Sequence, residues 1–260
     1  MKERRTSKAR RRWVIKAGSN LIVNGGPLLI RSWMQQIARI RRDHNIEVIW
    51  VSSGAVATGK ERSAFSKSKR TMAEKQALSA IGQPLLMGIY DTALQVTGQL
   101  GAQILLTYDD MTHLTRKKNL RNTLNQLLKW NVVPILNEND ATATEELQFG
   151  DNDTLSAKAA IMMKAERLVI LTDVEGLFDS DPRKNPQAQL LSHLPKVTPK
   201  TLAMAPKGAG TSVGTGGMHS KLTAAQLAGR HGIETWLAKG DANSILEIIA
   251  ADKLVGTRIG

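Results

Sequence analysis

Residues 48–55 read VIWVSSGA and join four consecutive apolar side chains to a short turn of small residues. An apolar run without alternation is typical of a strand that is covered on both faces, as in a parallel sheet. Two serines and a glycine directly after it suit a turn that opens a helix, where hydroxyls and free amides are available. The stretch therefore predicts a strand, a turn and a helix, with the turn at the carboxyl end of a buried strand.

Similar units recur along the chain. Further apolar runs occupy residues 13–15, 103–106, 132–136, 168–171 and 233–237. Helix-period segments lie between them, with an apolar stripe at positions 30, 33, 34, 37 and 38 and further candidates at 85–97, 118–129, 154–164 and 221–231. This βαβα order predicts an α/β fold, a three-layer αβα sandwich around a mostly parallel central sheet. Residues 59–70 and 179–207 have the composition of long loops.

The basic charge is concentrated at the start of the chain. The 260 residues carry 36 Lys+Arg against 23 Asp+Glu, a formal net charge of +13. Residues 1–70 hold 17 of the bases and 4 of the acids, whereas residues 71–260 hold 19 of each. Seven bases and one acid lie in residues 1–12 alone. We expect residues 1–12 to be a disordered basic leader and residues 13–260 to form a single domain.

Composition excludes several classes of protein. The chain has no cysteine, which rules out disulfide frameworks, thiolate catalysis and cysteine-ligated metals. The five histidines are scattered without an H-x-x-x-H pair, which disfavours a histidine-rich metal site. The apolar run after the leader is interrupted at Lys16, and no window approaches the length of a membrane span. We therefore expect a cytoplasmic protein without a membrane segment.

Ligands of open parallel sheets bind at the carboxyl ends of the strands, so the residues that follow each apolar run are candidates for the site. Residues 16–19 (KAGS) could cradle a phosphate with a lysine and a small-residue turn, or could be a surface lysine before an ordinary turn. Residues 52–55 (SSGA) could bind an anion or simply cap a helix. Neither motif alone distinguishes an anion-binding site from an ordinary turn or helix cap.

Acidic and amide side chains gather in two later segments, residues 137–140 (NEND) and 150–154 (GDNDT). Such a concentration of carboxylates requires a cation, an amino-group ligand or bulk water. A solvated acidic loop remains an alternative, whereas a calcium loop would need a continuation that residues 151–155 lack. These segments suit a small zwitterionic acceptor together with a magnesium ion.

Residues 214–221 (GTGGMHSK) combine a glycine-rich stretch with a lysine in a predicted first helical turn. The helix dipole disfavours a cation there, so an anion bound by both the lysine and the backbone amides is expected, although the stretch could be a mere linker. Together, Lys16 and Lys221 could flank a phosphoryl group in transit. Phosphoryl transfer needs alignment and charge neutralisation more than a general base.

The motifs, taken in order, resemble those of the glutamate 5-kinases of the amino-acid kinase family. They are residues 16–19 (KAGS), 51–55 (VSSGA), 137–140 (NEND), 150–153 (GDND), 171–173 (LTD), 181–183 (DPR) and 214–218 (GTGGM). The likeness runs from about residue 13 to residue 256. It implies the amino-acid kinase fold and transfer of the ATP γ-phosphoryl group to the side-chain carboxylate of L-glutamate, the first step towards proline. It also implies ATP and Mg²⁺ as cofactors.

The resemblance implies a role for each matching residue. The catalytic set would be Lys16, Lys221 and Asp153. The acceptor would be bound by Ser53, Gly54, Asp140, Asp151 and Asn152. The nucleotide would be bound by Lys16, Gly18, Ser19, Thr172, Asp173, Thr215, Gly216, Gly217, Met218, His219, Ser220 and Lys221. It assigns no metal ligand.

Some features depart from the family pattern. The basic leader is not part of it, and His219-Ser220 stands where small or hydroxyl residues are usual. The sequence ends at Gly260, where many relatives continue into a small RNA-binding-like domain, and both a naturally short form and a truncated chain are compatible with this. The alternatives are an aspartate, N-acetylglutamate or uridylate kinase, and, less favoured, a basic nucleic-acid-binding protein. Expected partners are L-glutamate, proline as a feedback inhibitor and further copies of the chain.

Overall fold

The computed structural model describes residues 11–63, 65, 70–142, 151–182, 184–205 and 217–260. These residues contain an eight-stranded sheet in the order β3-β4-β2-β1-β5-β7-β8-β6. Its strands are β1 (Arg11–Ala17), β2 (Ile46–Val51), β3 (Gly101–Leu106), β4 (Val133–Glu138), β5 (Arg167–Thr172), β6 (His193–Leu194), β7 (Glu234–Lys239) and β8 (Thr257–Ile259). Neighbouring strands are parallel except β7 and β8, which are antiparallel.

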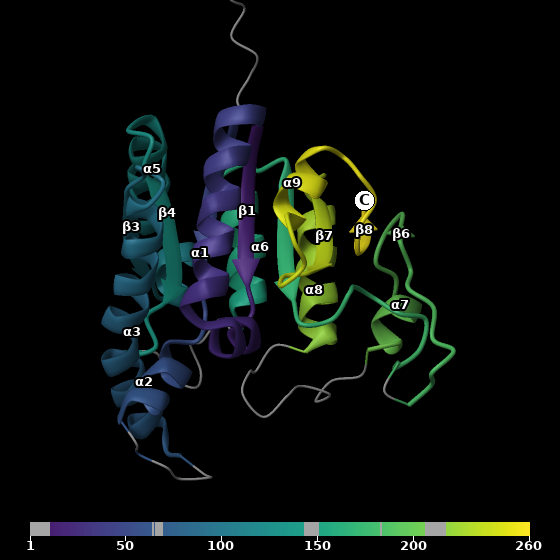
Figure 1. Cartoon of the computed structure of the whole chain (residues 1–260), viewed down its shortest axis with the longest axis horizontal. Helices are drawn as coiled ribbons and strands as arrows, with labels where there is room; N and C mark the ends of the chain where they lie inside the picture. The colour runs from purple at the N-terminus through teal and green to yellow at the C-terminus, as the bar shows by residue number, and fades with distance from the viewer. Residues whose placement is uncertain (1–10, 64, 66–69, 143–150, 183, 206–216) are drawn as a thin grey trace, which may run out of the picture.

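Helices cover both faces of this sheet (Figure 1). They are α1 (Ser19–His44), α2 (Ala55–Ser63), α3 (Met72–Gln95), α4 (Tyr108–Thr112), α5 (Leu114–Lys129), α6 (Asn152–Met162), α7 (Pro199–Ala203), α8 (Met218–Gly229) and α9 (Ile245–Ala250). Along β1, Val14 joins a core with α5, α6 and α8, while Trp13 and Ile15 join a second core with α1, α3 and α9. The predicted three-layer αβα sandwich with a mostly parallel sheet is confirmed.

Each of the six predicted strands overlaps an observed strand, with the runs at 132–136 and 233–237 starting one residue early, but β6 and β8 were not predicted. These two have only two and three residues, too short for an apolar run to reveal them. Part of the predicted loop over residues 59–70 is helical, since α2 continues to Ser63. Within this helix Gly59 allows close backbone contact, because a Cβ built there would lie 1.9 Å from the carbonyl oxygen of Leu78 in α3.

The second predicted loop, residues 179–207, also contains regular structure. It holds strand β6 and helix α7, where Thr198 caps the helix by accepting a hydrogen bond from the amide of Thr201 at 3.1 Å. Pro199 occupies the first helical position, where a missing N–H costs nothing. A proline that suggested a loop is therefore a helix start.

Helix α1 confirms the predicted apolar stripe, with Ile30, Trp33, Met34 and Ile37 all buried. Its helical geometry breaks at Gly26, whose φ of 53° lies in the left-handed region. Within the described residues, no helix combines the length and the apolar character that crossing a membrane requires.

Strand β1 begins at Arg11 and so includes the last two residues of the predicted leader. Arg11 forms a bidentate ion pair with Glu166, whose carboxylate lies 2.8 Å from its Nε, and Arg12 pairs with Glu47 at 2.7 Å. The backbone also joins, because the carbonyl of Arg12 accepts a hydrogen bond from the amide of Glu166. Opposite charges on neighbouring segments thus extend the strand into the basic region. Residues 1–10 of the leader lie outside the described residues.

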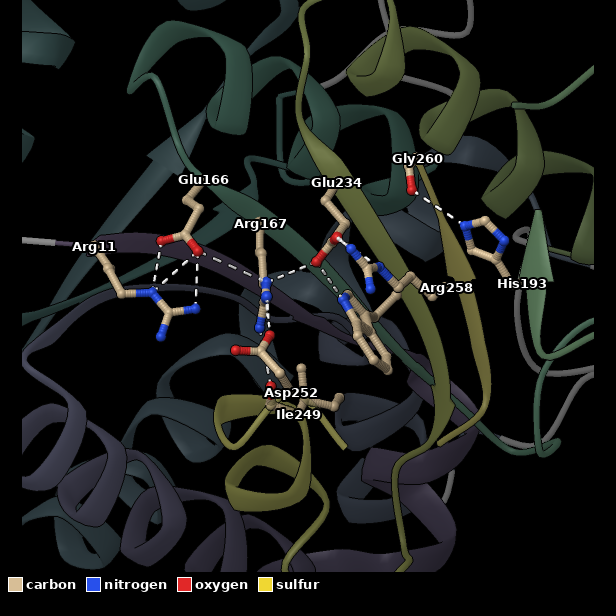
Figure 2. Close-up of polar contacts among 10 residues, drawn as sticks. Arg11, Glu166, Arg167, His193, Glu234, Ile249, Asp252, Arg258 and Gly260 are labelled. Atoms are coloured by element: carbon tan, nitrogen blue, oxygen red, sulfur yellow. Dashed lines mark hydrogen bonds and ion pairs between the residues drawn. The ribbon is translucent and has the colours of Figure 1, made fainter. Parts of the chain in front are cut away.

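A buried arginine organises the edge of the sheet where β5 and β7 begin (Figure 2). The Nε of Arg167 lies 2.7 Å from the carboxylate of Glu234, and its Nη1 donates to the carbonyl of Ile249 at 2.9 Å. Its Nη2 pairs with Asp252. This network lies at the amino ends of the parallel strands, which leaves their carboxyl ends as the edge where ligands of such sheets bind.

Candidate active site

The turns after β1, β2, β4 and β5 meet at one edge of the sheet. The amide of Gly18 donates to the carbonyl of Leu171 at 3.2 Å, which joins the end of β1 to the end of β5. The amide of Ser52 donates to the carbonyl of Leu136 at 2.8 Å, which joins β2 to β4. These bonds continue the sheet ladder by one residue and bring the polar turns together.

Asp153, in the first turn of α6, contacts both predicted lysines. Its Oδ1 lies 2.6 Å from the Nζ of Lys16, and its Oδ2 lies 3.4 Å from the Nζ of Lys221. Ser220 adds a hydroxyl that donates to the same Oδ2 at 2.6 Å. All three charged side chains are buried, and Asp153 is fully so. The strand end of β1 and the start of α8 are thereby tied to a single carboxylate.

The ionisation of this cluster follows from its contacts. Burial alone would raise the pKa of Asp153, but the ammonium groups of Lys16 and Lys221 hold it well below its usual range. Burial lowers the pKa of Lys16, and the charge of Asp153 opposes that shift. The carboxylate is therefore ionised and holds two cations close together in a region shielded from solvent.

Next to this cluster, a chain of amide side chains links three segments. Asn152 donates from Nδ2 to the hydroxyl of Ser53 at 3.0 Å and to Oδ1 of Asn137 at 2.9 Å. Asn137 in turn donates to Oε1 of Gln83, in α3, at 2.8 Å. The Oδ1 of Asn152 is buried and has no hydrogen-bond partner among the described residues. An unsatisfied buried acceptor of this kind suits a ligand that brings its own donor.

Two further carboxylates flank these amides. Asp140 accepts a hydrogen bond from the hydroxyl of Ser79 at 3.2 Å, and Asp151 caps α6 by accepting from the amide of Thr154 at 2.7 Å. Burial raises the pKa of both, and for Asp151 the charge of Asp153 adds to the increase. Gly54, the remaining predicted acceptor residue, has a φ of +89°, a conformation that its lack of a side chain permits.

The residues predicted to bind nucleotide lie at the ends of β1 and β5 and at the start of α8. Asp173 accepts from Nδ2 of Asn20 at 3.0 Å and from the hydroxyl of Thr172 at 3.1 Å, so the turns after β1 and β5 are bonded together. Gly18 precedes α1 and Ser19 is its first residue. The first turn of α1 is thus next to Thr172-Asp173.

Helix α8 begins with residues predicted for the glycine-rich nucleotide loop. Gly217 is its N-cap, and Met218, His219, Ser220 and Lys221 follow. His219 contacts the carbonyl oxygen of Ala205 through Nδ1 at 2.8 Å, so this departure from the family pattern has a local partner. Thr215 and Gly216 lie outside the described residues, as does Gly150 of the acidic segment.

The site contains residues that the sequence reasoning did not select as ligands. Asn20 and Asn137 were visible in the sequence, since Asn20 directly follows the motif at residues 16–19 and Asn137 stands inside the motif at residues 137–140. Ser79 and Gln83 gave no signal, because they lie inside a long helix far along the chain from the residues they contact.

Comparison with known proteins adds an independent finding. The profile of the amino acid kinase family matches residues 11–239. The glutamate 5-kinase of Nitrosococcus oceani is 46% identical over 254 residues, which cover 96% of this chain and 67% of that protein. The glutamate 5-kinase of Marinomonas sp. is 43% identical over 250 residues, covering 95% and 66%. The chain thus spans about two thirds of the length of these relatives.

Solved structures share the architecture at low sequence identity. A UMP kinase from Bacillus anthracis aligns with a TM-score of 0.64 and 15% identity over 97% of each chain. An isopentenyl phosphate kinase from T. acidophilum aligns with a TM-score of 0.65 and 15% identity, over 95% of this chain and 99% of that one. The two proteins are named for different substrates and are only 15% identical to this chain, so their similarity shows the fold alone.

Proposed function

The chain belongs to the amino acid kinase family, and from that premise we propose that it is a glutamate 5-kinase. It transfers the γ-phosphoryl group of ATP to the side-chain carboxylate of L-glutamate, forming L-glutamyl 5-phosphate for proline biosynthesis. The observation that carries the proposal is the buried cluster in which Asp153 holds Lys16 and Lys221 beside the amide side chain of Asn152. The identity of 43–46% to glutamate 5-kinases supports the choice of acceptor.

Two cations serve the transferred group. Lys16 and Lys221 neutralise the charge that spreads over the phosphoryl oxygens as the bond to ATP breaks and the bond to the carboxylate forms. Asp153 orients both ammonium groups, and because its own charge is balanced by them it does not repel the phosphates. A fixed cation pair needs no reorganisation at the moment of transfer.

The acceptor is bound by Ser53, Gly54, Asp140, Asp151 and Asn152. The carboxylates of Asp140 and Asp151 attract the α-ammonium group of glutamate. Asn152 contributes its unsatisfied Oδ1 as a further acceptor. The side-chain carboxylate of glutamate is already ionised at neutral pH and is itself the nucleophile, so no general base is required.

The nucleotide lies along the turns after β1 and β5 and the start of α8. Gly18, Ser19, Thr172 and Asp173 hold one side of it. The other side is held by Gly217, Met218, His219, Ser220 and Lys221 at the start of α8. Thr215 and Gly216, which lie outside the described residues, are proposed as nucleotide-binding from their motif alone. The amides at the start of α8 favour an anion, and Lys221 adds a full charge there.

Magnesium enters with ATP rather than through a site built by the protein alone. Among the described residues, no three His, Asp or Glu side chains gather to hold an ion, and the most buried carboxylate, Asp153, is engaged by two lysines. These residues do not fit a resident metal centre. Phosphate oxygens supply ligands of the kind Mg²⁺ prefers.

Three further expectations accompany this proposal. We propose the cytoplasm as the compartment, in keeping with a chain that lacks cysteine. We expect several copies of the chain to assemble, and proline to inhibit by occupying the acceptor site. Size-exclusion chromatography with light scattering tests the assembly, and titration of proline against glutamate tests the inhibition.

Acyl phosphate formation is the decisive measurement. The purified chain is incubated with Mg-ATP and hydroxylamine, and hydroxamate is measured with glutamate, aspartate and N-acetylglutamate, while ADP release is followed with uridylate. Turnover with glutamate well above the others supports the proposal. Clear turnover of another acceptor without turnover of glutamate would replace it by the corresponding kinase of the same family.

A further inference from the structure

Helix α3 reaches the acceptor site with two buried polar side chains that no motif predicted. Ser79 and Gln83 stand four residues apart, so they lie on the same face of the helix. Both are buried. Burying a serine or a glutamine costs stability unless its polar atoms are paired, so the partners of Ser79 Oγ and Gln83 Oε1 indicate what the two residues do, while Nε2 of Gln83 has no partner among the described residues.

The two side chains contact the end of β4 and the segment that follows it, since Asn137 lies within the strand and Asp140 just after it. Ser79 donates to Oδ2 of Asp140 at 3.2 Å, and Gln83 accepts from Nδ2 of Asn137 at 2.8 Å. Asn137 then accepts from Asn152, and Asn152 reaches Ser53. The helix therefore bonds directly to one acceptor residue and, through Asn137, to the amide of another.

Gln83 and the backbone of Glu138 together fix how the amide of Asn137 is oriented, because the amide of Glu138 donates to Oδ1 of Asn137 at 3.0 Å. Because Oε1 of Gln83 accepts, the NH₂ group of Asn137 faces α3 and the carbonyl oxygen faces Asn152. Oδ1 of Asn137 accepts a hydrogen bond from the NH₂ group of Asn152. The NH₂ group of Asn152 therefore faces Asn137, and Oδ1 of Asn152 has no partner among the described residues. Rotating the side-chain amide of Gln83 by 180° would place its NH₂ group against the NH₂ group of Asn137, and the hydrogen bond between the two residues would be lost.

The same helix is held in place by the segment that carries Ser53. A Cβ built on Gly82 would lie 1.9 Å from the carbonyl oxygen of Ala55, and one on Gly59 would lie 1.9 Å from that of Leu78. Helices α2 and α3 therefore touch backbone to backbone. Since α2 starts two residues after Ser53, this contact and the hydrogen bonds of Ser79 and Gln83 connect α3 to both sides of the acceptor site.

We propose that Ser79 and Gln83 are positioning residues for the amino-acid acceptor, which set the orientation of Asp140 and Asn152 without touching the phosphoryl group. The proposal rests on the proposed function, because it assigns the acceptor to this side of the site. It concerns binding of the acceptor and not the chemistry at the lysines. Its expected signature is a change in KM for the acceptor with little change in kcat or in KM for ATP.

The test compares Gln83→Met with a matched control, Gln36→Met. Methionine keeps the volume and the helix propensity but cannot accept from Asn137. Gln36 is likewise a buried helical glutamine, whose Oε1 accepts from the amide of Leu246 at 2.9 Å, and none of its recorded partners belongs to the site. We expect KM for glutamate to rise roughly tenfold in Gln83→Met, the size of one lost buried hydrogen bond, and to stay unchanged in Gln36→Met.

A double mutant separates positioning from a direct or a general effect. If Gln83 acts through Asn152, then Asn152→Ala already removes its benefit, and adding Gln83→Met should raise KM little further. Independent, multiplied increases would overturn the proposal, as would an unchanged KM or an equal loss for ATP and glutamate. If Gln83→Met does not fold, Ser79→Ala replaces it in the comparison of KM values. This variant removes only the hydroxyl that bonds to Asp140, and we expect it to raise KM for glutamate severalfold.

Wild-type turnover separates this proposal from the one on which it rests. The four acceptors are first assayed with the unaltered chain, and failure with glutamate counts against the proposed function alone. The variants are then compared with whichever acceptor is turned over. An unchanged KM for that acceptor in a folded Gln83→Met variant would reject the positioning role whatever the substrate, and Ser79→Ala decides in the same way if Gln83→Met does not fold.

Discussion

The ammonium group of Lys16 lies 2.6 Å from the carboxylate of Asp153, with both side chains buried. One residue lies in the first strand and the other in the first turn of α6, so the ion pair is made by the fold and not by local sequence. Lys221 shares the same carboxylate. A single acidic side chain therefore fixes two cations that the proposed reaction requires.

Asp153→Asn should impair both stability and catalysis. Lys16 would remain buried without its counter-charge, so we expect the free energy of unfolding to fall by about 3–5 kcal/mol. We expect kcat to fall by roughly 10²-fold, since the cations lose their orientation. Urea denaturation and steady-state kinetics measure the two effects. Combining Asp153→Asn with Lys16→Met should restore stability but not turnover, and restored turnover would refute the assignment of Lys16.

Lys221→Ala and Asp140→Ala should affect different kinetic constants, kcat for the first variant and KM for glutamate for the second. Loss of Lys221 removes an interaction that is strongest in the transition state, so kcat should fall by about 10²-fold with a smaller change in KM. Loss of Asp140 should mainly raise KM for glutamate. Lys118→Ala, an exposed lysine of α5, serves as the control and should alter neither constant. The reverse pattern for the first two variants would show that the two loops are wrongly assigned.

Binding of the acceptor should weaken in mild acid. Burial raises the pKa of Asp140 above its ordinary value of 3.8, so this carboxylate takes up a proton at a higher pH than a free one. The neutral form attracts the α-ammonium group of glutamate less. We expect kcat/KM for glutamate to fall as the pH decreases through that raised pKa, and Asp140→Asn to remove this step from the profile. An identical acid limb in the variant would exclude Asp140 as its origin.

Gly82→Ala should separate two helices that are in backbone contact. Its Cβ would meet the carbonyl oxygen of Ala55, so we expect a loss of about 1–3 kcal/mol in stability and a higher KM for glutamate. Gly88 lies in the same helix with no atom near its built Cβ, and Gly88→Ala should stabilise by up to about 1 kcal/mol. Thermal or urea unfolding measures the stability of both variants. Equal stability of Gly82→Ala and Gly88→Ala would contradict the backbone contact between Gly82 and Ala55.

Arg167→Met should destabilise the fold without affecting the site. The substitution removes the pair with Asp252 and the hydrogen bond to the carbonyl of Ile249 at the edge of the sheet opposite the candidate site, while Glu234 keeps Arg258, and we expect a loss of about 1–3 kcal/mol. KM for ATP and glutamate should stay unchanged. Arg42→Ala, which removes an exposed pair with Asp43, should produce no measurable change in stability. A raised KM in Arg167→Met would show that the two edges are coupled.

The strands were predictable because burial on both faces requires apolar residues at consecutive positions, as at Val48–Val51. The strands β6 and β8 were not, because two or three residues carry too little pattern. The loop predicted over residues 59–70 was wrong in its first part, because a composition rich in Lys, Arg and Ser does not reveal that α2 continues to Ser63 or that Gly59 packs against α3. Glycine serves a loop and a close helix contact equally well, and only the presence of Leu78 opposite it distinguishes the two.

The sequence by itself determined the layered α/β fold, the membership in a kinase family and the turns in which Lys16, Asp153 and Lys221 would be found, because apolar periodicity and short motifs are local properties. Only the tertiary structure decided that one carboxylate contacts both lysines and that Ser79 and Gln83 of α3 bond to Asp140 and Asn137. These contacts join side chains from segments far apart in the chain, and hydrogen bonds and ion pairs depend on distances that exist only once the helices have packed on the sheet.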